Sequence, residues 1–303
     1  MRVYIKNHPS DAGHWIYNKG YVSAWQALGY EPTLYDRLTD IDTSNEYSLM
    51  AVDADITDST GLQVLEKATK VWLYVQPNTY PGKWGRHPNF ITSATDKLIS
   101  YVNILPNVKK WSFLSANDTV FNKWGKVHSI PLAFDSVGYL KEIKPYHQKY
   151  HYDVCYIGGR ANNGFDEKIK LIDSTFNQFE NSGLNTGFFI NRGLSLSDEA
   201  NILFHSEVGL NIHDVFQREY GFDTNERTFK TLGLTGLLAS DANSQFETLF
   251  GIKGTNNLEQ LVDMVKASLE LSSIERKTLK DQSRDNILRN HTYVNRVESL
   301  LKL

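Results

Sequence analysis

Short apolar runs recur along this chain, and each is followed by a polar segment. The runs are rich in Val, Ile, Tyr and Phe, and Gly, Asn, Asp or Pro bounds them. Runs of this kind are typical of buried strands in a mainly parallel sheet. The first set is Arg2–Ile5, Ser48–Val52, Val71–Val75, Trp111–Leu114 and Ile130–Leu132, and the second is Val154–Ile157, Gly187–Ile190, Val208–Ile212 and Gly236–Ala239.

Helical spacing fills the segments between these runs. Tyr21, Trp25 and Leu28 recur at helical intervals, and Gly29 ends that pattern. Residues 166–179 and 258–269 are further amphipathic helix candidates. Strands that alternate with helices predict an α/β class with layered, right-handed crossovers.

The chain divides near residues 131–150, where Pro131 and Pro145 flank a polar stretch. A length of 303 residues also favours two domains. We therefore predict two Rossmann-like α/β domains, 1–135 and 136–303, that face each other across a cleft. Whether the last helix returns to the first domain stays open. Ligands of such sheets bind beyond the carboxyl ends of the strands, so the cleft is the expected site.

Charge and cysteine content exclude several classes of protein. There are 32 Lys and Arg against 35 Asp and Glu, a formal charge of −3, which is unlike a general nucleic-acid binder. One cysteine, Cys155, excludes an intramolecular disulfide framework and Cys-rich metal sites. The N-terminus lacks the apolar region of a secretory signal, and no membrane-spanning run occurs. We expect a soluble, cytoplasmic protein.

The first candidate site follows the run Val154–Ile157. Gly158 and Gly159 allow the backbone to turn sharply and to approach a ligand, and Arg160 adds a guanidinium suited to phosphate. The N–H groups of the next helix favour an anion at the same place. An ordinary strand-to-helix turn with a surface arginine is the alternative.

The second candidate is the segment Asn225-Glu226-Arg227-Thr228-Phe-Lys230. Asn225 or Thr224 is suited to cap a helix that opens at Glu226. Arg227 in the first turn and Lys230 one turn later lie where cations and backbone N–H groups hold a diphosphate. A capped helix with two solvated cations is the alternative.

Two further clusters carry polar side chains near strand ends. Asn211 and His213 alternate along one run, and we expect them to point toward the ligand, unless His213 is a satisfied core histidine. The loop after the first strand contains Asp11 and His14, which suit acid–base chemistry.

The second and third candidates carry a resemblance to a known family. The segment 225–229, the strand 236–241 that ends in Asp, Phe246-Glu247, the helix from Leu258 and the segment Arg289–Arg296 resemble the C-terminal half of two-domain GT-B glycosyltransferases. The nearest kin are the spore-maturation-type proteins of bacteria and phages. The resemblance spans about residues 127–303.

This resemblance implies a nucleoside diphosphate sugar as donor, UDP- or GDP-linked, on the C-terminal domain. Its diphosphate is expected near Arg160, Arg227 and the helix that opens after Asn225. The acceptor is expected on the N-terminal domain, near residues 7–15, with His14 and Asp11 as candidate catalytic residues. Enzymes of this fold usually need neither metal nor cofactor, because cations and helix N-termini stabilise the departing diphosphate.

Two departures from the family pattern affect the prediction. The family has an acidic residue at position 230, which holds the donor ribose in related enzymes, whereas this chain has Lys230. A lysine only donates hydrogen bonds, so either other residues recognise the ribose or the donor differs, and Lys230 is a candidate for a further phosphate contact. The paired glutamates of many retaining relatives are also absent. Retention or inversion is therefore not predicted.

Three readings of the function stay open. The first is sugar transfer to a glycan, to a protein or to a hydroxymethylated base in phage DNA, for which the lysines at 109, 110, 123, 126, 141 and 144 would supply a basic face. The second is a non-catalytic nucleotide-sugar-binding protein, and the third is a sugar epimerase of similar build. The oligomeric state is not predicted.

Overall fold

The computed structural model describes residues 1–9, 13–57, 59–86, 90–115, 119–159, 166–190 and 192–303. The chain forms two compact units, Met1–Pro131 with Tyr293–Leu303, and Leu132–Thr292. The contacts thus end the first unit at Pro131, where we had placed the boundary after residue 135, and they assign the last helix to the first unit.

The first unit contains a parallel sheet in the order β2-β1-β3-β4-β5-β6. Its strands are β1 (Arg2–Lys6), β2 (Glu31–Tyr35), β3 (Ser48–Val52), β4 (Lys70–Tyr74), β5 (Val108–Ser112) and β6 (His128–Ser129). The sequence pattern missed β2, because this edge strand is mostly exposed and contains Pro32. The apolar run Ile130–Leu132 is not a strand; the short β6 lies just before it.

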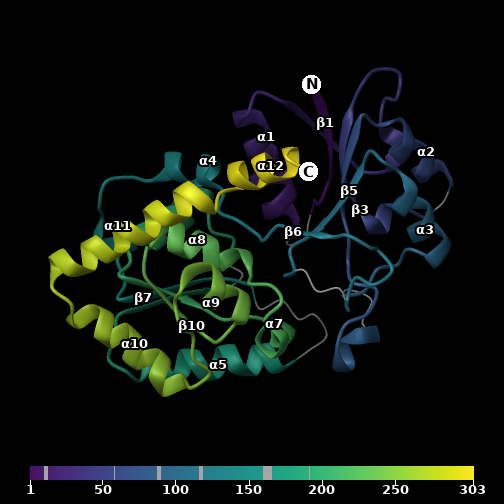
Figure 1. Cartoon of the computed structure of the whole chain (residues 1–303). Coiled ribbons are helices and arrows are strands. Elements are labelled where there is room, and N and C mark those ends of the chain that lie inside the picture. Colours follow the sequence, from purple (N-terminus) through teal and green to yellow (C-terminus); the bar gives the residue numbers. More distant parts are fainter. Residues whose placement is uncertain (10–12, 58, 87–89, 116–118, 160–165, 191) are drawn as a thin grey trace. The chain divides into compact units, whose positions relative to one another are not determined.

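Helices cover both faces of this sheet, with η1, α1 and α12 packed together and α2 and α3 on the other side (Figure 1). Gly20 allows the close approach of α12, because a Cβ there would lie 2.3 Å from the Tyr293 ring. Trp72 donates a hydrogen bond to the Leu300 carbonyl at 2.7 Å. The helices are η1 (His14–Tyr21, a π-helix), α1 (Val22–Ala27), η2 (Leu38–Asp40), η3 (Asp53–Asp55), α2 (Ser59–Lys67), η4 (Gly82–Arg86), α3 (Asp96–Ile104) and α12 (Tyr293–Leu301).

The second unit contains a four-stranded parallel sheet in the order β10-β9-β7-β8. Its strands are β7 (Val154–Gly158), β8 (Thr186–Ile190), β9 (Val208–Asn211) and β10 (Leu238–Ser240). Its helices are α4 (Ser136–Tyr139), η5 (Leu140–Glu142), η6 (Gln148–Tyr150), α5 (Asp166–Glu180), α6 (Leu196–His205), α7 (Val215–Tyr220), α8 (Glu226–Leu234), α9 (Ser244–Phe250), α10 (Leu258–Glu270) and α11 (Ser273–Asn290). The predicted helices at 166–179, 226 onward and 258–269 are confirmed as α5, α8 and α10.

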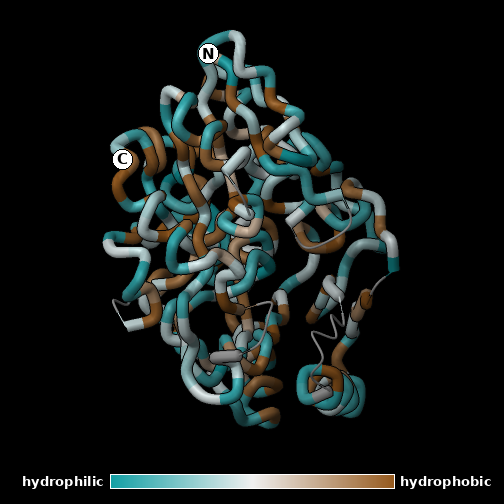
Figure 2. Tube along the Cα trace, turned by 90° about the vertical axis from the view of Figure 1, so that its right-hand side faces the viewer, coloured by the Kyte–Doolittle hydropathy of each residue, from teal (hydrophilic) through white to brown (hydrophobic). Residues whose placement is uncertain are grey.

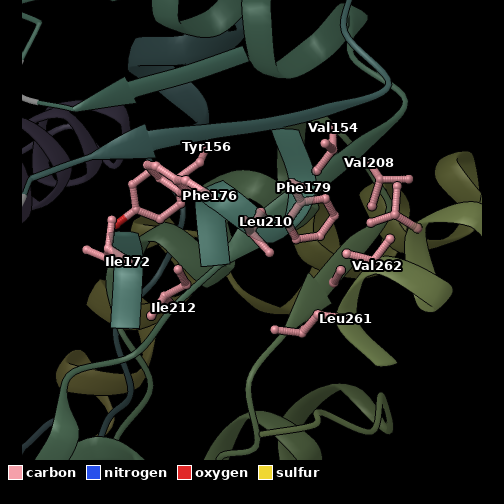
Figure 3. Packing of buried hydrophobic residues seen from close by; sticks show 12 residues of the cluster. Val154, Tyr156, Ile172, Phe176, Phe179, Val208, Leu210, Ile212, Leu261 and Val262 are labelled. Atoms are coloured by element: carbon pink, nitrogen blue, oxygen red, sulfur yellow. The ribbon is translucent and has the colours of Figure 1, made fainter. Parts of the chain in front are cut away.

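Apolar side chains of α5 and α10 form the core on one face of this sheet. Figure 3 shows Phe176 beside Tyr156, with ring centroids 5.2 Å apart, and Leu261 and Val262 below β9. The helices α6 and α8 cover the opposite face, and α11 packs on α8. Short hydrophobic and hydrophilic segments alternate along the trace (Figure 2).

The strand order reverses between β7 and β9, because the chain adds β8 on one side of β7 and β9 on the other. Open parallel sheets bind ligands beyond the carboxyl ends of the strands at such a reversal. The predicted pair of Rossmann-like parallel sheets is confirmed. None of the helices in the described ranges has the length and apolar character needed to cross a membrane.

Candidate active site

Arg227 lies at the reversal point of the second sheet. Its Nε donates to the Ile157 carbonyl at the end of β7, at 2.9 Å, and its Nη1 donates to the Ile212 carbonyl beyond β9, at 3.3 Å. The guanidinium also lies over the Tyr156 ring, 4.5 Å from its centroid. Within the described part of the chain, no carboxylate forms an ion pair with it. Arg227 therefore presents a guanidinium that forms no ion pair with a carboxylate of the described residues.

Gly158 makes room for this guanidinium. A Cβ at Gly158 would lie 2.3 Å from Nη2 of Arg227, far inside van der Waals contact. The structure thus brings two of the predicted site residues together. Gly159 follows directly after β7, and Arg160 lies outside the described residues.

The N-terminus of α8 adjoins Arg227, and Asn225 caps it as predicted. The Asn225 side chain accepts a hydrogen bond from the Thr228 amide at 3.2 Å and donates to the Ile212 carbonyl at 3.3 Å. The Ile212 carbonyl therefore holds both Asn225 and Arg227. A capped helix start beside a fixed guanidinium is an arrangement that binds anions.

Asn211 and His213 do not present their side chains to a ligand, in contrast to our expectation. Both are fully buried. Nδ1 of His213 lies 2.5 Å from Asp241 Oδ1, and Nε2 lies 2.7 Å from Thr224 Oγ1, so both ring nitrogens have partners. Asn211 donates to the Thr228 hydroxyl at 3.1 Å. The Asn211 and His213 side chains do lie close together, as the alternation predicted, but they pack under the start of α8 and are closed off from solvent.

Lys230 is paired with carboxylates, and the predicted phosphate contact is wrong in this geometry. Its Nζ lies 2.5 Å from Glu199 and 3.6 Å from Glu226, and it lies over the Tyr139 ring at 5.7 Å. Burial alone would lower the pKa of Lys230, but the two carboxylates raise it well above its ordinary value. Burial also raises the pKa of Glu226, which lies in the first turn of α8.

The sequence analysis missed a buried ion pair near this site. Lys168, in the first turn of α5, lies 2.5 Å from Asp214. Burial lowers the pKa of Lys168, Asp214 opposes this, and the charge of Arg227 adds to the lowering. The charge of Arg227 therefore affects the pKa of a lysine in the first turn of α5. One sequence signal could have indicated this ion pair, namely a lysine at the start of the helix that follows Gly158 and Gly159.

Asp223 was also missed as a site residue. Burial raises the pKa of its carboxyl to about 6. Oδ2 accepts from Gln217 at 2.8 Å, whereas Oδ1 is buried without a hydrogen-bond partner among the described residues. The loop before α8 therefore contains a buried carboxyl with one acceptor oxygen unused among the described residues.

The two candidate catalytic residues belong to the first unit. His14 begins η1, and its Nδ1 lies 3.2 Å from the His8 carbonyl. Its ring also contacts Trp15 edge-on at 5.6 Å. Asp11 lies outside the described residues. Their predicted roles stay predictions.

Comparison with known families agrees with this arrangement. Residues 155–302, which include β7, Arg227 and α8, match the family model described as glycosyl transferase-like. The C-terminal half of the chain thus resembles glycosyltransferases, and the fold is that of the GT-B class. This confirms the family resemblance inferred from the segment 225–229. No curated protein sequence matches the chain.

Solved structures support the fold assignment. An alpha-glucosyltransferase in complex with UDP and a 13-mer DNA containing an HMU base has a TM-score of 0.60 at 10% identity, over 99% of this chain and 98% of that one. A UDP-forming alpha,alpha-trehalose-phosphate synthase from Burkholderia vietnamiensis has a TM-score of 0.54 at 8% identity, over 87% and 73%. A protein from Listeria monocytogenes described as a putative UDP-N-acetylglucosamine 2-epimerase has a TM-score of 0.51 at 11% identity, over 99% and 94%. At these identities, the matches show the GT-B architecture alone.

Proposed function

We propose that this glycosyltransferase moves a sugar from a nucleoside diphosphate sugar to an acceptor hydroxyl. The observation that carries the proposal is the guanidinium of Arg227, which is fixed at the sheet reversal and pairs with no carboxylate in the part of the chain that the structure describes. Negative charge develops on the diphosphate as the sugar–oxygen bond breaks. Arg227 and the first N–H groups of α8 would stabilise that charge.

The donor is proposed to be UDP- or GDP-linked, and two observations support a UDP sugar. The alpha-glucosyltransferase of the same fold is in complex with UDP, and the trehalose-phosphate synthase is UDP-forming. Metal-independent catalysis stays part of the proposal. Among the described residues, no three His, Cys, Asp or Glu side chains cluster as metal ligands. The cytoplasmic location likewise stays a prediction.

The acceptor is proposed to bind the first unit, with a glycan or protein hydroxyl as the leading class. Modified DNA is the second candidate, because the match to the DNA-bound alpha-glucosyltransferase spans nearly the whole of both chains. The basic face expected for DNA is reduced at one position, since Lys123 pairs with Asp96. Lys109 and Lys126 still lie near His128, whose pKa is lowered by burial and by their charges.

A nucleotide panel tests the donor. We expect one of the UDP-, GDP-, TDP- and CDP-sugars to stabilise the protein, by about 2.7 kcal/mol at 100 times its dissociation constant. Thermal unfolding with each compound measures this. The donor that responds is then incubated without acceptor, because slow hydrolysis distinguishes a transferase from a non-catalytic binding protein. Absence of any response across the panel contradicts the proposed donor class.

Acceptor classes are separated by transfer of the labelled sugar. Duplex DNA that carries a hydroxymethylated base is compared with the same duplex without the modification, and with glycan and protein hydroxyls. Label that is incorporated only into the modified duplex assigns the DNA function.

Substitution of Gly158 by alanine is expected to weaken donor binding and turnover by about 10- to 100-fold, because small displacements of a positioned group have effects of this size. The new Cβ would displace the Arg227 guanidinium, from which it would be 2.3 Å away. Steady-state kinetics with the responding donor measures the loss. In an Arg227→Ala background, Gly158→Ala should add little, since the displaced group is then absent. Equal losses in both backgrounds would mean that Gly158 acts by another route.

A further inference from the structure

A chain of buried polar side chains connects β10 to the first turn of α8. Asp241 Oδ1 lies 2.5 Å from Nδ1 of His213, whose Nε2 lies 2.7 Å from Thr224 Oγ1. Thr224 Oγ1 lies 2.8 Å from Thr228 Oγ1, which donates to Asn225 Oδ1 at 3.2 Å. The first four of these residues are less than one-tenth exposed. The chain therefore ends at the cap of the helix that carries Arg227.

The hydroxyl groups determine which atom donates in each hydrogen bond of this series. Each threonine has one hydroxyl proton, and Asn225 Oδ1 can only accept. All the contacts are hydrogen bonds only if His213 Nε2 donates to Thr224, Thr224 donates to Thr228, and Thr228 donates to Asn225. The network therefore assigns Nε2 of His213 as the donor to the Thr224 hydroxyl.

His213 and Asp241 also fix the backbone that holds Arg227. The amide of His213 donates to both Asp241 oxygens, at 3.1 and 3.0 Å. This anchors the neighbouring Ile212, whose carbonyl accepts from both Arg227 Nη1 and Asn225 Nδ2. Asp241 thus acts on the Arg227 site by two routes, the backbone of Ile212 and the hydroxyl chain.

We propose that His213 is a positioning residue, which with Asp241 and Thr224 holds Arg227 and the cap of α8 in the geometry that binds the diphosphate. His213 does not touch the ligand. The proposal rests on the proposed function, because Arg227 is taken as the diphosphate contact. It accounts for the burial of His213, which we had expected to point toward the ligand.

Thr224→Val tests the hydroxyl chain, because it removes one hydroxyl from a fully buried position. We expect UDP binding about tenfold weaker, the effect of losing one buried hydrogen bond. Thr224→Ser restores the hydroxyl and should return affinity to within about twofold. If the valine variant fails to fold, Thr224→Ala serves in its place. GDP replaces UDP if only GDP binds the wild type.

Thr235→Val is the matched control at the other end of α8. Thr235 is also fully buried, and its hydroxyl donates to the Leu203 carbonyl at 2.7 Å. It should lower the melting temperature as Thr224→Val does, without changing the dissociation constant of UDP. If Thr224→Val and Thr235→Val bound UDP with equal affinity, the positioning role of the His213 network would be overturned, and its role would be structural.

A measurement without ligand separates this proposal from the proposed function. In the wild type, the Thr228 amide should exchange slowly with solvent, and it should exchange faster in Thr224→Val but not in Thr235→Val. Wild-type protein that binds neither UDP nor GDP contradicts the proposed function, and the exchange rates then decide the positioning role alone. Unchanged exchange in Thr224→Val overturns it.

Discussion

Replacing Arg227 with alanine is expected to lower sugar transfer by about 100- to 1000-fold, the usual effect of removing one donor that stabilises developing negative charge. The guanidinium is held by two backbone carbonyls and an aromatic ring, so its position exists before the ligand arrives. Steady-state kinetics with the donor that stabilises the protein measures the loss, in kcat as well as in KM, because the charge develops during the reaction.

Arg284 provides a matched control for Arg227. Its guanidinium donates to the Leu234 and Phe204 carbonyls, at 2.7 and 3.0 Å, and lies 4.3 Å from the centroid of the Phe204 ring. It makes the same backbone and ring contacts on α11, together with an ion pair to Asp281 at 3.7 Å, away from the carboxyl ends of β7 and β9. Arg284→Ala should lower stability and leave the kinetics of the folded enzyme nearly unchanged. If Arg227→Ala and Arg284→Ala lost activity equally, the loss would come from damage to the fold and would contradict a specific role of Arg227.

Lys230→Met is expected to lower the free energy of unfolding by about 3–5 kcal/mol, as removal of one partner from a buried ion pair does. It would leave Glu199 and Glu226 without the cation that lies 2.5 and 3.6 Å from them. Chemical denaturation near neutral pH measures the difference. Glu199→Gln should cost less, because Lys230 keeps Glu226 as a partner. An equal cost for both variants would contradict the assignment of Lys230 as the common partner.

The deficit of Lys230→Met should depend on pH. Burial already raises the pKa of Glu226, and loss of the lysine raises it further. A carboxyl whose pKa is higher in the folded state contributes stability at low pH that is lost as pH rises through that pKa. The deficit relative to the wild type should therefore shrink as pH falls from about 8 to about 5. A deficit that grows toward low pH would contradict this sign.

Local signals predicted the parts of the site that depend on neighbouring residues. Asn225 caps α8, and Glu226 opens it, because both preferences operate within a single turn of helix. The glycines after β7 indicated a close approach, and the structure identifies the approaching group as Arg227. The strand runs of the second unit were predicted well, because parallel buried strands leave continuous apolar segments.

Other residues depend on partners that are far apart in the sequence. His213 lies between Asp241 and Thr224, and no spacing rule relates these positions. Lys230 lies on the face of α8 that meets Glu199 of α6, so its charge is neutralised by a helix that the local pattern could not place beside it. Edge strand β2 was missed because exposure and Pro32 remove the apolar pattern of a buried strand.

A crystal structure of the protein with UDP would show whether Arg227 holds the diphosphate. We expect diphosphate oxygens at about 3 Å from the Arg227 guanidinium and from the first N–H groups of α8. The side chains of His213 and Lys230 should keep the partners described above and should not touch the nucleotide. A diphosphate bound elsewhere in the chain, with Arg227 unoccupied, would contradict the account.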